Sequence, residues 1–183
     1  MKQLLSSFPV LVLTLSIGLI PGAAQAQSDA IQDIRTKFTT INQMEFQEIL
    51  TLENGQFLEQ IPDGGGQLTA YYQDEQLYKL VEWIGLSFGH RVTEYYFWEG
   101  DLFFVFQQEK RFGFDAEAGA IDYDQLEEVF AGRYYLNEGS LIKVLQKGNP
   151  QMGSWEGTEG EALLPLIQGS LEELQKSMQL TRE

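Results

Sequence analysis

The sequence predicts an α+β domain in which a single, curved antiparallel β-meander sheet is accompanied by an N-terminal and a C-terminal amphipathic helix. The main observation is a motif written three times: a Tyr-Tyr pair, a short acidic turn and an apolar strand. The copies span 95–105, 134–144 and, in a degenerate form without the glycine of the turn, 71–81. Each copy has the pattern of two strands joined by a tight turn. Apolar residues spaced by three and four on either side of this region predict the two helices.

The first 26 residues have the pattern of a secretory signal peptide. Lys2 gives a positive start, an apolar run covers 8–20, and Ala24-Gln25-Ala26 supplies the small residues of a cleavage site. The run is short for a membrane span, although an uncleaved anchor is the alternative. Cleavage after Ala26 leaves 157 of the 183 residues as one domain, 27–183, in the periplasm or outside the cell, with no integral membrane segment.

The mature domain is expected to open with a helix over 29–44. The apolar residues of this helix form one stripe: Ile31, Ile34, Phe38 and Ile41. Strands over 45–52 and 56–61 are expected to flank Asn54-Gly55, because this dipeptide is the strongest two-residue hairpin signal.

The rest of the chain divides into loops, strands and a second helix. Glycines and a proline predict a loop over 62–66, and about six strands are expected over 68–145. A polar insertion at 109–124 is predicted to be a surface loop within this strand region. A further loop is expected over 147–160. The chain is expected to close with a helix over 162–180, whose stripe consists of Leu164, Ile167, Leu171, Leu174 and Met178.

Aligning the three motifs separates two faces of the sheet, because side chains alternate across a strand. One face carries the first tyrosine of each pair: Tyr71, Tyr95 and Tyr134. This face holds no charged residue, so we expect it to be the core face beneath one or both helices. The residues expected to be buried on it beyond the turns are Phe103, Val105, Ile142 and Val144.

The opposite face combines the second tyrosines with other large aromatic residues. The candidate ligand-binding or partner-binding residues are Tyr72, Tyr96, Trp98, Phe104 and Tyr135. They share the face with charged residues that are costly to bury unpaired, namely Lys79, Glu94, Arg133 and Lys143. We therefore expect an open aromatic surface that binds a protein or an apolar small molecule. Two alternatives stay open: the face could curl into a second small core, or its tyrosines could pair across strands.

Catalytic and metal-binding motifs are weak in this sequence. His90 is the only histidine, and Ser87 and Glu94 lie near it, but the glycine-framed serine of a nucleophile elbow is missing. A single histidine does not make a histidine-based zinc site. The acidic residues of the insertion lack the spacing of a twelve-residue calcium loop; they are Asp115, Glu117, Asp122 and Asp124. No catalytic residue, cofactor or metal ligand is therefore assigned.

Charge and cysteine content narrow the range of partners. The chain has a net charge of −15 at pH 7 and no cysteine. Nucleic acids and anionic membrane surfaces are poor partners for such a chain, because both attract positive charge. Disulfides, thiol nucleophiles and lipid attachment through a cysteine are all excluded.

The repeated hairpins resemble those of uncharacterised exported bacterial proteins, in which an aromatic pair and a turn with glycine precede Leu and apolar residues. The likeness covers 93–106 and 133–144, and it implies an exported β-meander without naming an activity. A looser similarity, of fold only, is to periplasmic lipoprotein carriers. The leading hypothesis is an exported, non-enzymatic domain that binds a protein or an apolar ligand on its aromatic face. The alternatives are a periplasmic hydrolase that uses carboxylates or the Ser87/His90 region, and a half-barrel similar to the lipid or lipoprotein carriers.

Overall fold

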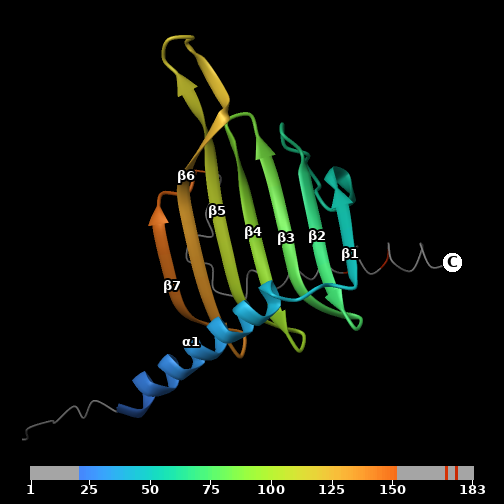
Figure 1. The fold of residues 1–183 in the computed structure, drawn as a ribbon, viewed down its shortest axis with the longest axis vertical. Coiled ribbons are helices and arrows are strands. Elements are labelled where there is room, and N and C mark those ends of the chain that lie inside the picture. Colours follow the sequence, from blue (N-terminus) through green and yellow to red (C-terminus); the bar gives the residue numbers. More distant parts are fainter. Residues whose placement is uncertain (1–20, 152–171, 173–175, 177–183) are drawn as a thin grey trace, which may run out of the picture.

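The structure is a computed structural model, which describes residues 21–151, 172 and 176. Helix α1 (Pro21–Asn42) precedes seven strands: β1 (Glu48–Glu53), β2 (Gly66–Gln73), β3 (Gln76–Leu86), β4 (Gly89–Trp98), β5 (Asp101–Asp115), β6 (Ala120–Asn137) and β7 (Ser140–Gly148). The strands pair antiparallel in chain order and form one open sheet (Figure 1). The predicted α+β meander is confirmed. The C-terminal helix expected over 162–180 lies outside the described residues, apart from positions 172 and 176.

The three motifs form three hairpins of one design. Each has a two-residue turn in which both residues have positive φ: Asp74-Glu75, Glu99-Gly100 and Glu138-Gly139. This is the turn geometry that matches the twist of the flanking strands. The strand leaving each turn then carries one unpaired, extra residue at the third position, which makes a β-bulge. The bulged residues are Tyr78, Phe103 and Ile142.

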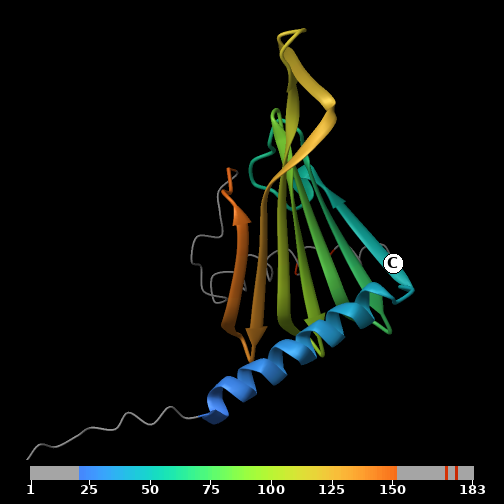
Figure 2. The same ribbon diagram turned by 60° about the vertical axis from the view of Figure 1, so that its left-hand side comes forward.

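Helix α1 crosses the end of the sheet that carries these three turns, as Figures 1 and 2 show from two sides. Ile34 and Ile41 are its buried residues, and they pack in one cluster with Tyr96, Phe104 and Tyr135. The helix therefore covers the face of the second tyrosines. The sequence prediction had placed the helix on the opposite face, so that assignment is wrong.

The charged residues that favoured an open aromatic face are accommodated without being buried alone. Lys79 Nζ lies 3.0 Å from Glu94 Oε2, and both side chains are partly exposed. Arg133 is exposed beside the helix. The prediction assumed that these charges would be costly to bury beneath a helix. The ion pair of Lys79 with Glu94 and the exposed position of Arg133 avoid that desolvation cost.

The face turned away from α1 carries its own apolar cluster. The buried members of this cluster are Leu52, Leu68, Ala70, Tyr72, Leu80, Tyr95, Phe97, Leu102, Val105, Tyr134 and Leu136. Phe103 and Val105 are both buried, as predicted, but on opposite faces, because the bulge at Phe103 breaks the alternation. Val144 is 40% exposed on the edge strand β7, so its predicted burial is wrong.

The degenerate motif is shifted by one residue relative to the other two. One residue fewer separates its Tyr-Tyr pair from the turn, so Tyr71 and not Tyr72 occupies the position of Tyr96 and Tyr135. Tyr71 accordingly contacts Phe46, with ring centroids 5.3 Å apart. Tyr72 lies on the face turned away from α1, and its predicted place on the aromatic face is wrong.

Two expectations for the N-terminal part are also corrected. Helix α1 begins at Pro21, eight residues before the expected start, since proline fits the first turn of a helix and the following residues favour helix. Asn54-Gly55 does not join a hairpin, because β1 pairs with β2 and Asn54–Gln56 forms a short 3₁₀ helix. Asn54 has the positive φ of a hairpin turn, but its Oδ1 accepts a hydrogen bond from the backbone of Gly66.

The insertion expected to be a loop instead lengthens a hairpin. Strands β5 and β6 continue through it and project beyond the rest of the sheet (Figure 1). Phe114 pairs with Ile121 in this arm, so alternating apolar residues decide its structure, and only the tip is a turn. Along the described residues, no helix combines the length and the apolar character needed to cross a membrane.

Candidate functional site

Tyr96 is the centre of an aromatic cluster beneath α1. Its ring centroid lies 4.9 Å from that of Phe38 on the helix and 5.7 Å from that of Phe104 on β5. Phe104 also contacts Phe38 at 5.3 Å and Tyr135 at 5.1 Å. Tilted and edge-to-face contacts at these distances are favourable for aromatic pairs. The cluster fixes the end of α1 against three neighbouring strands, β4, β5 and β6.

Polar groups at the border of the cluster hold the Tyr96 side chain. Its hydroxyl donates a hydrogen bond to the Glu94 carboxylate and lies 3.2 Å from Asn42 Oδ1. Lys79 Nζ pairs with the same carboxylate and lies 5.0 Å from the centroid of the Tyr96 ring. Burial, with a further contribution from Glu94, raises the pKa of Tyr96 far above its usual value of 10. The phenol therefore stays neutral and acts as a structural donor.

A pocket of about 250 Å³ opens beside this cluster, between α1 and strands β5 and β6. It is lined by Ile34, Arg35, Phe38, Phe104, Phe106, Arg133 and Tyr135. Five of these seven side chains are apolar or aromatic, and the two arginines are exposed. A mainly apolar lining with a small number of polar groups is typical of small-molecule sites. This pocket is the candidate functional site.

The pocket brings together part of the predicted set of binding residues. Phe104 and Tyr135 line it, whereas Tyr96 is fully buried beside it. The expectation that these three form an exposed surface is wrong, because α1 covers them. Trp98 is half-buried and contacts Tyr78, with ring centroids 5.9 Å apart. Of the predicted residues, it is the one that keeps partial exposure on this face.

The helix supplies the lining residues that the sequence prediction missed. Ile34 and Phe38 belong to the apolar stripe that predicted α1, and Arg35 lies next to them in the chain. On β6, Arg133 stands directly opposite Phe106, and its Cζ lies 5.0 Å from the centroid of the Phe106 ring. The apolar stripe was enough to predict that one face of the helix is buried. No pattern in the chain indicated against which face of the sheet that helix face packs.

The Ser87/His90 region is not arranged as a nucleophilic triad. Ser87 and Phe88 form the turn between β3 and β4, and no hydrogen bond joins Ser87 to His90 in the described residues. Glu94 is engaged with Lys79 and Tyr96. Burial, and then the nearby Lys110, lowers the pKa of His90. His90 packs beside Trp83, with ring centroids 6.0 Å apart, which is a structural contact.

Two carboxylates on the face turned away from α1, the partly buried Glu82 and the buried Glu109, are relevant to the hydrolase alternative. Glu82 lies 3.4 Å from Arg91, and burial raises the pKa of Glu82 in spite of that arginine. Glu109 is fully buried, and its Oε2 accepts a hydrogen bond of 2.6 Å from the backbone of Gln151. Both carboxylates thus make contacts that hold the fold.

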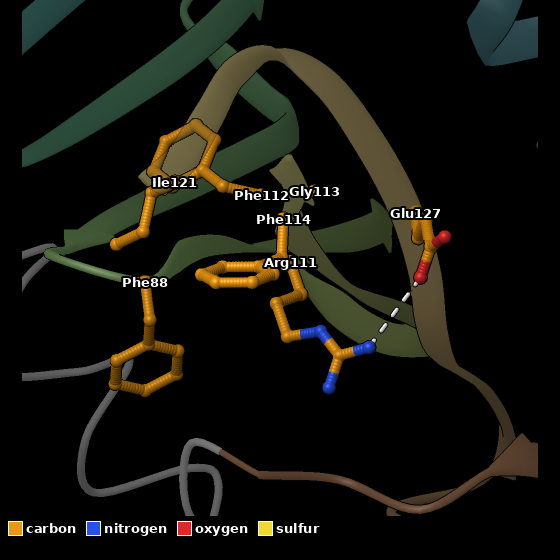
Figure 3. A pocket seen from close by; sticks show the side chains of 7 residues that line it. All are labelled: Phe88, Arg111, Phe112, Gly113, Phe114, Ile121 and Glu127. Carbon is orange, nitrogen blue, oxygen red and sulfur yellow. Dashed lines mark hydrogen bonds and ion pairs between the residues drawn. The ribbon is translucent and has the colours of Figure 1, made fainter. Parts of the chain in front are cut away.

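The projecting arm carries a second hollow, lined by Phe88, Arg111, Phe112, Gly113, Phe114, Ile121 and Glu127 (Figure 3). Phe114 is 68% exposed, so the arm presents apolar surface to solvent. Arg111, the one cation among the described residues of this lining, lies 3.4 Å from Glu127 and is already paired. The residues that the structure describes around this hollow therefore offer no free charged group to orient a ligand.

The acidic residues of the arm bind their own backbone. Asp115 Oδ1 accepts hydrogen bonds from the amides of Glu117 and Ala118, at 2.8 and 3.0 Å. Asp122 Oδ1 accepts one from the amide of Asp124 at 3.0 Å. Among residues 21–151, 172 and 176, no group of three or more histidine or acidic side chains is arranged to hold a metal ion.

The chain was compared with known protein families, curated proteins and solved structures. No protein-family model, curated protein or solved structure matches the chain. The resemblance to exported hairpin-repeat proteins stays a prediction, and the candidate function depends on the geometry of the pocket.

Proposed function

We propose that this chain is an exported, non-enzymatic binding domain that holds the apolar part of a small ligand between α1 and the aromatic face of the sheet. The observation that carries the proposal is the pocket beside Phe104 and Tyr135. Its volume of about 250 Å³ is close to the lower end of the range for small-molecule sites, which is about 300 Å³. A ligand of modest size, or one short apolar chain, fits such a space.

The character of the lining supports binding over catalysis. Aromatic rings from α1, β5 and β6 surround the space, and ordered aromatic contacts hold several of them in place. Such rings supply contact area at little cost in side-chain entropy. Among the described residues of the lining there is no carboxylate or histidine, and the phenol of Tyr135 is the only hydroxyl group. Groups that transfer protons or attack a substrate are thus scarce at this site.

Export is part of the proposal and has a separate test. The signal-peptide pattern of the first 26 residues predicts that the mature chain begins at Gln27. Gln27 donates a hydrogen bond of 2.7 Å to the backbone oxygen of Ile142, so cleavage before Gln27 keeps this contact between α1 and β7. Sequencing of the amino terminus of the exported protein checks the cleavage site, and a chain that retains Met1 contradicts it.

The absence of cysteine allows a direct test of the pocket. An Arg35→Cys variant carries a single thiol in the lining of the pocket. The unmodified variant should bind a neutral apolar probe, N-phenyl-1-naphthylamine, with increased probe fluorescence. Reaction of the thiol with a bulky maleimide should abolish this signal, because the adduct fills the space that the probe occupies.

Thr36→Cys is the matched control, since Thr36 is exposed on the next position of α1 and does not line the pocket. Its maleimide adduct should leave binding of the probe unchanged. Equal loss of binding in both adducts, or no loss in either, contradicts the proposed site. Circular dichroism of both adducts verifies that α1 and the sheet are intact.

A further inference from the structure

Some basic side chains of this acidic protein form ion pairs with carboxylates, and others do not. Residues 25–151 contain nine lysines and arginines, and five of them form ion pairs with a carboxylate. The other four have no ion pair within the part of the chain that the structure describes: Arg35, Lys110, Arg133 and Lys143. With 27 acidic residues in the chain, a cation without a carboxylate partner is unexpected.

Three of these four cations gather around the candidate pocket. Arg35 and Arg133 are part of its lining, on α1 and on β6. Lys143 stands on β7 directly opposite Tyr135, another lining residue, and therefore projects from the same face. Facing residues on neighbouring antiparallel strands have Cβ atoms about 5 Å apart. The three cations thus come from three different elements: two belong to the lining of one apolar space, and the third lies on the strand next to it.

We infer that the ligand of this pocket is an amphiphile whose anionic head, a carboxylate or a phosphate ester, is bound by Arg35 and Arg133 with Lys143 nearby. This inference rests on the proposed function, because it concerns the same pocket. Guanidinium groups present paired N–H donors that match the geometry of carboxylate and phosphate oxygens. The apolar tail of the ligand lies among Phe38, Phe104 and Phe106.

The arrangement matches such a ligand in both chemistry and position. The rings of the lining form the apolar part of the pocket, and Arg35 and Arg133 of the same lining are exposed to solvent. Arg133 is held over the ring of Phe106, which orients its guanidinium before a ligand arrives. None of the described residues that line the pocket carries a negative charge, so the field of this lining favours an anion despite the net charge of −15.

Isothermal titration of the full-length mature protein with three probes of equal chain length tests the inference. The probes are decanoate, decyl phosphate and decanol. We expect at least one of the two anions to bind about tenfold more tightly than decanol, because a hydrogen bond to a charged group is stronger than one to a neutral group. The relative affinities of decanoate and decyl phosphate identify which head group the site prefers.

Substitutions assign the preference to the named residues. Arg133→Gln should weaken binding of the preferred anion about tenfold and leave decanol binding unchanged. Lys110→Gln is the matched control: it removes the same charge from another cation without an ion pair, on β5 four residues beyond Phe106, or about 13 Å along the strand. It should change neither affinity.

The outcomes separate this inference from the proposed function. If decanol binds as tightly as both anions, the pocket is an apolar site and the anionic head is refuted. If Lys110→Gln weakens anion binding as much as Arg133→Gln does, the effect is one of net charge and the assignment to the pocket is wrong. If none of the three probes binds and the neutral naphthylamine also fails, the proposed function itself is refuted.

Discussion

Replacement of Tyr96 by phenylalanine isolates the contact that attaches the end of α1 to the sheet. The substitution keeps the ring and its contacts with Phe38 and Phe104, but it removes the hydroxyl that donates to Glu94. A hydrogen bond to a charged group contributes about 1.5–3 kcal/mol. Glu94 is partly exposed and keeps its ion pair with Lys79, so we expect the low end, a loss of about 1.5 kcal/mol.

Thermal and urea unfolding, followed by circular dichroism, measure this loss. For a domain of this size, about 1.5 kcal/mol corresponds to a decrease in Tm of about 3–6 °C. Tyr123→Phe is the matched control, because Tyr123 is 65% exposed and its hydroxyl makes no hydrogen bond to a described residue. It should change stability by less than about 0.5 kcal/mol. Equal effects of the two substitutions would show that the hydroxyl of Tyr96 does not make the stabilising contact with Glu94 beneath the helix.

Three further measurements address the turns and the partly buried Glu82 carboxylate. Gly100→Ala should destabilise the protein by about 1 kcal/mol in urea unfolding, because φ is +91° at Gly100 and no atom lies near enough to clash with the added carbon. Glu75 occupies the equivalent turn position at a φ of +62°, so Glu75→Gly should have the opposite sign and stabilise by about 0.5 kcal/mol. Burial raises the pKa of Glu82 above 4.5, so its contribution to stability is fully present below pH 4.5 and decreases as pH rises above that value. Glu82→Gln should therefore gain stability relative to the wild type between pH 4 and pH 7 in thermal unfolding, and a relative loss over that range would contradict the pKa direction.

The fold could be predicted because its signals are local and repeated. A turn, two strands and the alternation within each strand lie within about a dozen residues, and the chain repeats this unit three times. Consecutive hairpins with short connections form a meander with no further information. Helix α1 was predicted from its apolar stripe for the same reason. The arm of β5 and β6 was missed because its small and polar residues obscure the alternation that Phe112, Phe114 and Ile121 maintain.

The assignment of the two faces failed at identifiable residues. Strict alternation places Phe103 with Val105 and Tyr78 with Leu80, but in each case the third residue after the turn is a bulge, which turns the bulged side chain toward α1. The sequence of a single hairpin does not indicate such a bulge. The one indication in this chain is that the same position is apolar or aromatic in all three motifs, where it is Tyr78, Phe103 and Ile142.

The three motifs are aligned correctly when residue positions are counted from the turn of each hairpin. Alignment by the Tyr-Tyr pairs places the degenerate motif one residue out of register. Hairpin register is set by the turn, because the two turn residues fix which residues face each other. Measured in this way, Tyr71, Tyr96 and Tyr135 are equivalent and all lie on the side of α1, while Tyr72 matches Phe97 and Leu136 on the other side. The pocket depends on this register, since a slip of one residue on β6 would turn both Arg133 and Tyr135 away from the helix. The same hairpin geometry that builds the sheet therefore decides that cations and aromatic rings meet at one site.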